Sequence, residues 1–139
     1  MKNHKINRYI LILFLIRNAQ NARRPYLTYK FHKDFSPILN ILAHYGFILS
    51  YNIKANNVVI IWLKGFRGIT GVWHPSFSDV CRVPHYKRNP GSISSQLLRR
   101  IARNSGGNSL FFLNTDRGIM SHLDAIRFNI GGKLLFKIT

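Results

Sequence analysis

The residues best suited to chemistry lie in one short polar stretch, Asn114-Thr115-Asp116-Arg117-Gly118. Thr115 can donate and accept a hydrogen bond, Arg117 can hold a phosphate through two parallel N–H groups, and Gly118 leaves room for a close approach. These groups suit binding to a polyanion better than breaking a covalent bond. Taken alone, the stretch is equally typical of an ordinary tight turn, because Gly, Asn and Asp are common turn residues.

The charge of the chain supports the binding interpretation. Its 139 residues include 21 Lys and Arg but only four acids and no Glu, which gives a formal net charge of +17. Self-repulsion of this size opposes a compact fold unless a partner neutralises it, so we expect a nucleic acid partner. An anionic membrane surface is the alternative. The apolar fraction of 46% is that of a chain with a folded core.

Catalytic and metal sites find little support. The single cysteine, Cys81, excludes an intramolecular disulfide and a multi-cysteine zinc site. His74, Cys81 and His85 are the one group that could imitate metal ligands, and their spacing fits no standard site. A basic ribonuclease could use His74, His85 and a lysine, but no paired acids or nucleophile–base set accompanies them. We expect no enzyme activity, no cofactor, no metal and no small-molecule substrate.

The polar stretch lies between elements that should hold it in place. Residues 110–113 form a short apolar run typical of a strand covered on both faces, and Gly118 is available for a positive φ. Ser121 is expected to cap a short helix, with Asp124 three residues later. The apolar side expected for this helix comprises Leu123, Ala125, Ile126 and Phe128.

The end of the chain predicts a glycine pair and a last strand. Gly131-Gly132 should let another backbone approach closely. Residues 133–138 then alternate in part, with Lys133 and Lys137 expected on the face opposite the apolar residues.

The earlier part of the chain predicts a second set of elements. In order, we expect a helix at 6–21, a strand at 26–31, a helix at 36–45 and strands at 47–54 and 58–63. Ser36 should cap the second helix with Pro37 at its first position, and Gly46 should end it. Asn56-Asn57 suits the turn between the two strands.

These elements predict an α+β fold of two small lobes. The first, 1–65, is helix-strand-helix-hairpin, and the second, 85–139, is mostly β with short helices; glycines and prolines mark 66–84 as the connecting segment. A short helix at 97–103 should carry three arginines that either face solvent or contact phosphates. They are Arg99, Arg100 and Arg103.

The N-terminus superficially resembles a targeting segment. Lys2, Lys5 and Arg8 precede the apolar run 9–16, as in a secretory signal, and a basic start without acids also resembles a mitochondrial presequence. The run is far shorter than the ~20 residues needed to span a membrane. We therefore expect no membrane association.

Three motifs resemble one family specifically. Asn114 to Met120, followed by Gly131-Gly132, is similar to the C-terminal signature of the universal small-subunit ribosomal protein S8. The pentapeptide Ile16-Arg17-Asn18-Ala19-Gln20 closely resembles the end of that family's first helix. Asn89-Pro90-Gly91 falls on its Lys-Pro-Gly turn.

The resemblance implies a structural constituent of the small ribosomal subunit that binds the central domain of small-subunit ribosomal RNA and supports assembly beside neighbouring ribosomal proteins. The positions it implies for RNA contact are Asn114, Thr115, Asp116, Arg117, Gly118, Gly131 and Gly132, the turn Arg88, Asn89, Pro90 and Gly91, and Arg17, Tyr29 and Lys30, with Asn7 or Arg8 as further candidates. The competing interpretation from composition is a nonspecific basic nucleic-acid-binding protein, and selectivity for folded RNA over duplex DNA would separate the two.

The chain departs from the family pattern at three positions. Asn114 and Asp116 replace the two serines of the family's turn, and Lys133 replaces the Glu that follows the glycine pair. A carboxylate at 116 is unfavourable near phosphates unless it accepts a hydrogen bond from a base amine, a 2′-hydroxyl or a protein donor.

The resemblance also bears on localisation. It begins within roughly the first ten residues, which leaves little room for a cleaved targeting segment. Frequent Ile, Asn, Phe, Lys and Tyr with no Glu suggests an AT-rich organelle genome. We expect a mitochondrial ribosomal protein made in the organelle's matrix, with the plastid or the bacterial cytoplasm as alternatives.

Overall fold

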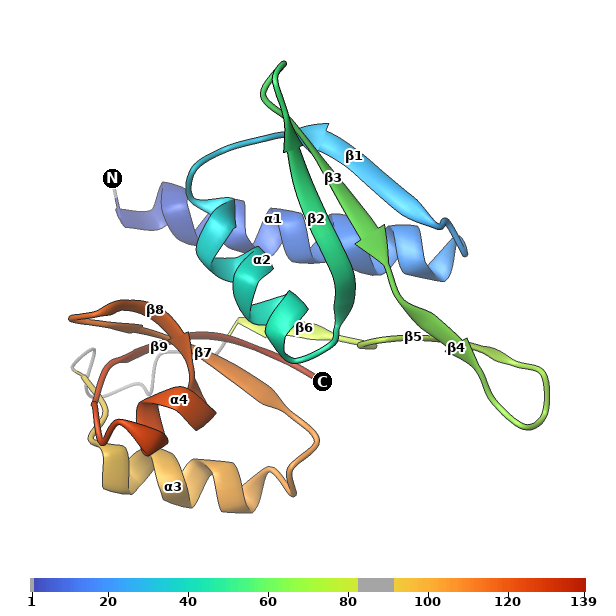
Figure 1. Cartoon of the computed structure of the whole chain (residues 1–139). Helices are drawn as coiled ribbons and strands as arrows, with labels where there is room; N and C mark the ends of the chain where they lie inside the picture. The colour runs from blue at the N-terminus through green and yellow to red at the C-terminus, as the bar shows by residue number, and fades with distance from the viewer. Residues whose placement is uncertain (1, 83–91) are drawn as a thin grey trace. The chain divides into compact units, whose positions relative to one another are not determined.

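The protein was analysed as a computed structural model that describes residues 2–82 and 92–139 (Figure 1). The described residues form two compact units, Met1–Ser78 and Asp79–Thr139. Both units combine helices with antiparallel strands, which confirms the predicted α+β class. Of the segment 66–84, which we expected to connect two lobes, residues 66–78 lie in the first unit and residues 79–82 in the second.

The first unit packs two helices against a three-stranded sheet. Its elements are α1 (Lys2–Asn21), β1 (Tyr26–Lys30), α2 (Phe35–His44), β2 (Ile48–Lys54) and β3 (Val58–Leu63), and the sheet order is β1-β3-β2. Fully buried side chains from both helices and β3 form the core, among them Ile12, Ile16, Leu39, Leu42 and Ile61. The hairpin between β2 and β3 turns at Asn57, whose φ of 55° confirms the predicted turn.

A further hairpin extends the first unit. It consists of β4 (Gly65–Arg67) and β5 (Trp73–Pro75), which pair antiparallel. Gln20, fully buried at the end of α1, fixes the chain that leaves this hairpin. Its side-chain amide donates to the Ser76 Oγ at 2.7 Å and to the Phe47 carbonyl at 3.2 Å. The backbone carbonyl of Gln20 accepts from the Trp73 indole N–H at 2.8 Å. The Trp73 indole is thus tied to the end of α1.

One predicted helix start is wrong. Helix α2 begins at Phe35 with Asp34 at its N-cap, so Ser36 and Pro37 lie in its first turn instead. Asp34 makes no side-chain capping bond, because its carboxylate binds Arg8 of α1 at 3.1 Å. A tertiary ion pair therefore replaces the local cap that the sequence favours.

The second unit is a four-stranded antiparallel sheet with two helices. Its elements are β6 (Val80–Arg82), α3 (Ser95–Asn104), β7 (Leu110–Thr115), β8 (Gly118–Ser121), α4 (His122–Arg127) and β9 (Lys133–Ile138), with the sheet order β6-β9-β7-β8. Leu98 of α3 and Ala125 of α4 pack with Phe111 and Leu113 of β7. The centroids of the Phe112 and Phe136 rings lie 4.7 Å apart. Strand β8 was not predicted.

The short helix α4 is capped as expected but differs in its apolar side. Ser121 is the N-cap; its hydroxyl oxygen accepts from the Asp124 N–H at 3.2 Å and its hydroxyl donates to the Asp124 carboxylate at 3.1 Å. Ala125 is buried, whereas Leu123 and Phe128 are 48% and 53% exposed. The prediction that these two side chains belong to the apolar face is wrong.

Candidate nucleic-acid interface

The hairpin between β7 and β8 is a rigid, internally bonded turn. Thr115 pairs with Gly118 across two connecting residues, Asp116 and Arg117, and Gly118 has a φ of 101°, as predicted. The Thr115 hydroxyl donates to the Gly118 carbonyl at 2.8 Å and accepts from the Arg117 N–H at 3.2 Å. Thr115 is only 8% exposed, so its hydroxyl fixes the turn, while the neighbouring polar side chains remain on the surface.

The surface of this turn consists of Asn114, Asp116, Arg117 and Gly118, all exposed. A Cβ added at Gly118 would meet no atom within 4 Å, so nothing in the described chain covers this point. The turn therefore offers a free backbone edge flanked by an amide, a carboxylate and a guanidinium.

The glycine pair is packed against protein backbone. A Cβ on Gly131 would lie 2.6 Å from the Ile93 carbonyl oxygen, and one on Gly132 would lie 2.7 Å from the Asn114 carbonyl oxygen. Ile93 and Gly132 exchange both backbone hydrogen bonds, at 2.7 and 3.1 Å. The predicted close approach is confirmed, and its partners are the chain before α3 and the end of β7, which bears the turn.

Two of the departures from the family pattern are neighbours in the sheet. Asn114 on β7 pairs directly with Lys133 at the start of β9, and directly paired residues share one face of a sheet. Lys133 therefore places a cation beside Asn114. This arrangement adds positive charge to the side of the hairpin.

An exposed aromatic residue that the sequence reasoning missed lies next to the turn. The Phe128 ring has the Arg117 guanidinium carbon 5.9 Å and the Arg127 guanidinium carbon 5.8 Å from its centroid. Both distances are within the range of cation–π contact. In the sequence, only the position of Phe128 at the end of a predicted helix, where side chains are often exposed, could have indicated that its ring is exposed.

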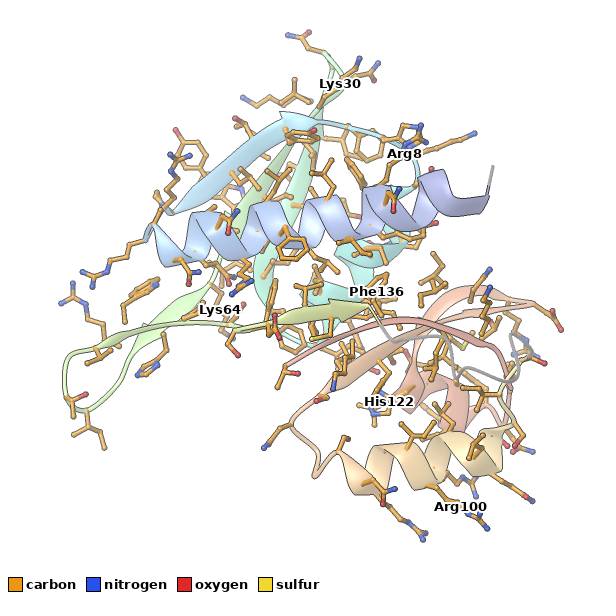
Figure 2. The ribbon with its side chains drawn as sticks, turned by 180° about the vertical axis from the view of Figure 1, so that it is seen from behind. Arg8, Lys30, Lys64, Arg100, His122 and Phe136 are labelled. Atoms are coloured by element: carbon orange, nitrogen blue, oxygen red, sulfur yellow. The ribbon has the colours of Figure 1, made fainter. Side chains whose placement is uncertain are left out.

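His122 anchors α4 behind the hairpin. It is 5% exposed, and its Nδ1 accepts from the Phe111 N–H of β7 at 3.1 Å (Figure 2). Burial lowers the pKa of His122 below that of a free imidazole, because the charged ring would be desolvated. The neutral ring is therefore a structural link between α4 and β7 and carries no charge toward a polyanion.

Helix α3 presents a basic face. Arg99, Arg100 and Arg103 are all exposed, and Arg100 points outward from the helix in Figure 2. The helix is capped by Ser94, whose hydroxyl oxygen accepts from the Leu97 N–H, and it is held to the core by Leu98. No acid lies within α3, so its arginines repel one another in the free protein.

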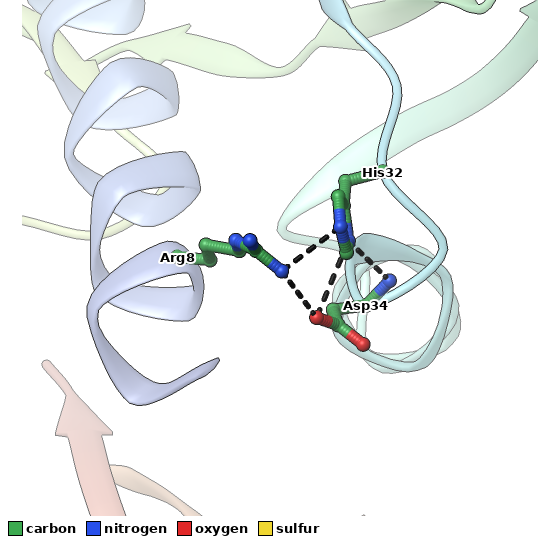
Figure 3. Close-up of polar contacts among 3 residues, drawn as sticks. All are labelled: Arg8, His32 and Asp34. Atoms are coloured by element: carbon green, nitrogen blue, oxygen red, sulfur yellow. Dashed lines mark hydrogen bonds and ion pairs between the residues drawn. The ribbon is translucent and has the colours of Figure 1, made fainter. Parts of the chain in front are cut away.

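In the first unit, Tyr29 and Lys30 lie beside Arg8. These residues line a shallow hollow of about 240 Å³ together with Leu11, Phe31, His32 and Phe35. Arg8 is held there by Asp34 and by the His32 Nε2, at 3.1 and 2.9 Å (Figure 3). The His32 Nδ1 accepts from the Asp34 N–H at 3.2 Å and also lies 3.2 Å from the Asp34 carboxylate.

Arg17 does not join that group. It lies nine residues after Arg8 on the continuous helix α1, and nine residues are two and a half turns, so the two side chains leave opposite sides. Arg17 is half-buried. The structure therefore separates Arg17 from Tyr29 and Lys30 within the first unit.

Some expectations fall outside the described residues. These are the turn residues Arg88, Asn89, Pro90 and Gly91, and also His85 of the weak metal-like group. Across residues 2–82 and 92–139, no three His, Cys, Asp or Glu side chains gather as a metal site would require. In the same residues, no helix has the length and apolar character needed to cross a membrane.

Comparison with known proteins decides the family. The family model described as Ribosomal protein S8 matches residues 11–139. This chain belongs to the ribosomal protein S8 family. The matched range contains the turn, the glycine pair and every position that the resemblance implied for RNA contact except the alternatives Asn7 and Arg8.

Bacterial members of the S8 family are similar over most of the chain. The protein named small ribosomal subunit protein uS8 of Wolbachia pipientis subsp. Culex pipiens is 29% identical over 126 residues, which cover 88% of this chain and 89% of that protein. Proteins of the same name from Rhizorhabdus wittichii and Dictyoglomus thermophilum are each 30% identical, covering 91% and 89% of this chain and 92% and 90% of their own length.

Proposed function

We propose that this S8-family chain is a structural constituent of the small ribosomal subunit that binds the central domain of its ribosomal RNA, supports subunit assembly and catalyses no reaction. The observation that carries the proposal is the β7–β8 hairpin, in which Thr115 satisfies the turn internally while Asn114, Asp116 and Arg117 stay exposed. The relatives' name, small ribosomal subunit protein, supports the ribosomal role.

The geometry of the hairpin suits folded RNA. An A-form helix presents a wide, shallow minor groove with 2′-hydroxyls and base edges, which proteins contact by shape and with small polar groups. Gly118 leaves the backbone edge open to a sugar, and Arg117 can bind a phosphate. We propose Asn114, Asp116, Arg117 and Gly118 as the contact surface, with Thr115, Gly131 and Gly132 holding it.

Further proposed contacts lie in the first unit and in the undescribed turn. Arg8, Tyr29 and Lys30 share one hollow, where a phosphate could approach Lys30 and Arg8. Arg17 is a separate contact on the other side of α1, and Arg88, Asn89, Pro90 and Gly91 remain predictions from the resemblance. Neighbouring ribosomal proteins are the remaining partners.

For localisation, we propose the mitochondrial ribosome, on the basis of the amino-acid composition. The similarity to bacterial proteins is equally expected of a ribosomal protein in the bacterial cytoplasm. Fractionation of cells of the source organism tests this point: the chain in the organelle pellet supports the proposal, and the chain in the cytoplasm with bacterial ribosomes contradicts it.

A competition experiment tests RNA selectivity. The full chain is bound to a labelled central-domain fragment of its own small-subunit ribosomal RNA and challenged with unlabelled fragment or with duplex DNA of equal phosphate content. We expect the RNA to compete at least a hundredfold better at about 0.15 M salt, because shape recognition adds to the charge term. Equal competition would instead favour a nonspecific basic nucleic-acid-binding protein. The net charge of +17 and the exposed arginines of α3 support that alternative.

A further inference from the structure

The surroundings of Phe128 are unusual for a large apolar side chain. The ring is 53% exposed at the C-cap of α4, where its backbone N–H donates to the Asp124 carbonyl at 2.9 Å. The next residue, Asn129, has a φ of 54°, and its side chain accepts from the Ser95 hydroxyl at 2.6 Å. The backbone position is thus fixed from two sides, and none of these contacts uses the ring.

Two guanidinium groups meet this ring. Arg127 is the sequence neighbour of Phe128, whereas Arg117 comes from the β7–β8 turn, ten residues before Arg127. Both guanidinium carbons lie within 6 Å of the ring centroid. In the part of the chain that the structure describes, no carboxylate forms an ion pair with either group, and Asp124 instead bonds Ser121. Two like charges are therefore held near one another by an aromatic surface, and neither is in an ion pair with a described carboxylate.

An unpaired nucleotide supplies both missing partners. Its base has a flat π-face that stacks on an aromatic ring, and its phosphate neutralises guanidinium groups. A peptide carboxylate would satisfy the arginines but would leave the exposed ring without a partner. A lipid surface would need more apolar area than one ring beside two arginines.

We propose that Phe128, Arg117 and Arg127 form a binding site for one unpaired RNA nucleotide, with the base on the Phe128 ring and a phosphate between the guanidinium groups. This inference rests on the proposed function, because it extends the hairpin surface by a contact to a single-stranded base. It assigns Phe128 and Arg127 a role that the turn residues alone do not provide.

Substitution of the ring tests the stacking contact. The full chain is titrated with the central-domain ribosomal RNA fragment and, separately, with a short single-stranded RNA. Phe128→Ala should weaken both affinities about tenfold, as expected for the loss of one stacked base. Leu123→Ala, which removes another half-exposed apolar side chain from the same helix, is the matched control and should stay within about twofold of the wild type.

Two conservative variants separate stacking from packing. Phe128→Tyr keeps the aromatic face and should bind like the wild type, whereas Phe128→Leu keeps apolar volume and should bind like Phe128→Ala. Near-wild-type binding by Phe128→Leu, or by Phe128→Ala, would overturn the inference, and thermal unfolding of each variant verifies that it is folded.

Salt dependence distinguishes the ring from the arginines. Arg127→Ala should reduce the slope of log affinity against log salt by about 0.7–0.9, the value for one lost phosphate contact, and Phe128→Ala should leave the slope unchanged. An unchanged slope in Arg127→Ala would contradict the phosphate contact. The proposed function is contradicted separately, if the wild type does not prefer the ribosomal fragment over duplex DNA. In that case the titration with single-stranded RNA still tests whether the Phe128 site binds a nucleotide.

Discussion

At the scale of single residues, the hydroxyl of Thr115 determines what the turn can present. Because it already donates to Gly118 and accepts from Arg117, a second contact with RNA is secondary to its structural role. The sequence suggested a hydroxyl offered to RNA, and the structure shows a hydroxyl that is hydrogen-bonded within its own turn.

Thr115→Val should therefore lower the free energy of unfolding by about 1–2 kcal/mol, because it leaves the Arg117 N–H without its acceptor. RNA affinity should fall as well, since the turn is then less well ordered before binding. Urea unfolding and filter binding measure the two effects. Thr115→Ser keeps the hydroxyl and should retain most of both; a loss in the Ser variant as large as that in the Val variant would contradict a role specific to the hydroxyl.

His122 gives a prediction about pH. Its folded-state pKa is depressed by burial, so the unfolded chain binds the proton more readily. Stability from this residue is present above the ordinary imidazole pKa of about 6.5 and is lost as the pH falls below it. Urea unfolding at pH 7.5 and 5.5 should show a loss in the wild type that is smaller in His122→Gln. An identical pH dependence in both proteins would mean that other groups cause it.

At the scale of elements, the sequence predicted local structure correctly where a residue interacts only with residues close to it in the chain. Ser121 with Asp124, Gly118 and Asn57 were all predictable, because capping and positive φ are decided within a few residues. The start of α2 was not predictable, since Asp34 is bound by Arg8 of α1, which lies 26 residues earlier in the chain. Phe128 was misassigned for a related reason: helical periodicity cannot reveal that α4 ends there.

Helix α3 provides the element-scale prediction. Arg99→Ala with Arg100→Ala should reduce the slope of log affinity against log salt by about 1.4–1.8, if each arginine neutralises one phosphate. Because both side chains are exposed, the stability of the protein should change little. Titrations at several salt concentrations measure the slope. A double variant with the wild-type slope would show that this face of α3 points into solvent when RNA is bound.

At the scale of the whole molecule, charge and family membership support the same account. A net charge of +17 favours a polyanionic partner that relieves self-repulsion, and membership of the ribosomal protein S8 family supports ribosomal RNA as that partner. Charge alone would not distinguish ribosomal RNA from any other nucleic acid. That distinction depends on the shape of the β7–β8 hairpin and on the glycine pair that fixes its base, which are local features of the second unit.

The most direct test of the central claim is an electron-density map of the small ribosomal subunit that contains this chain. We predict that residues 114–118 lie against the minor groove of small-subunit ribosomal RNA, with Gly118 facing a sugar edge and Arg117 at a phosphate. A map in which this turn faces solvent or another protein, or purified small subunits that lack the chain, would contradict the account.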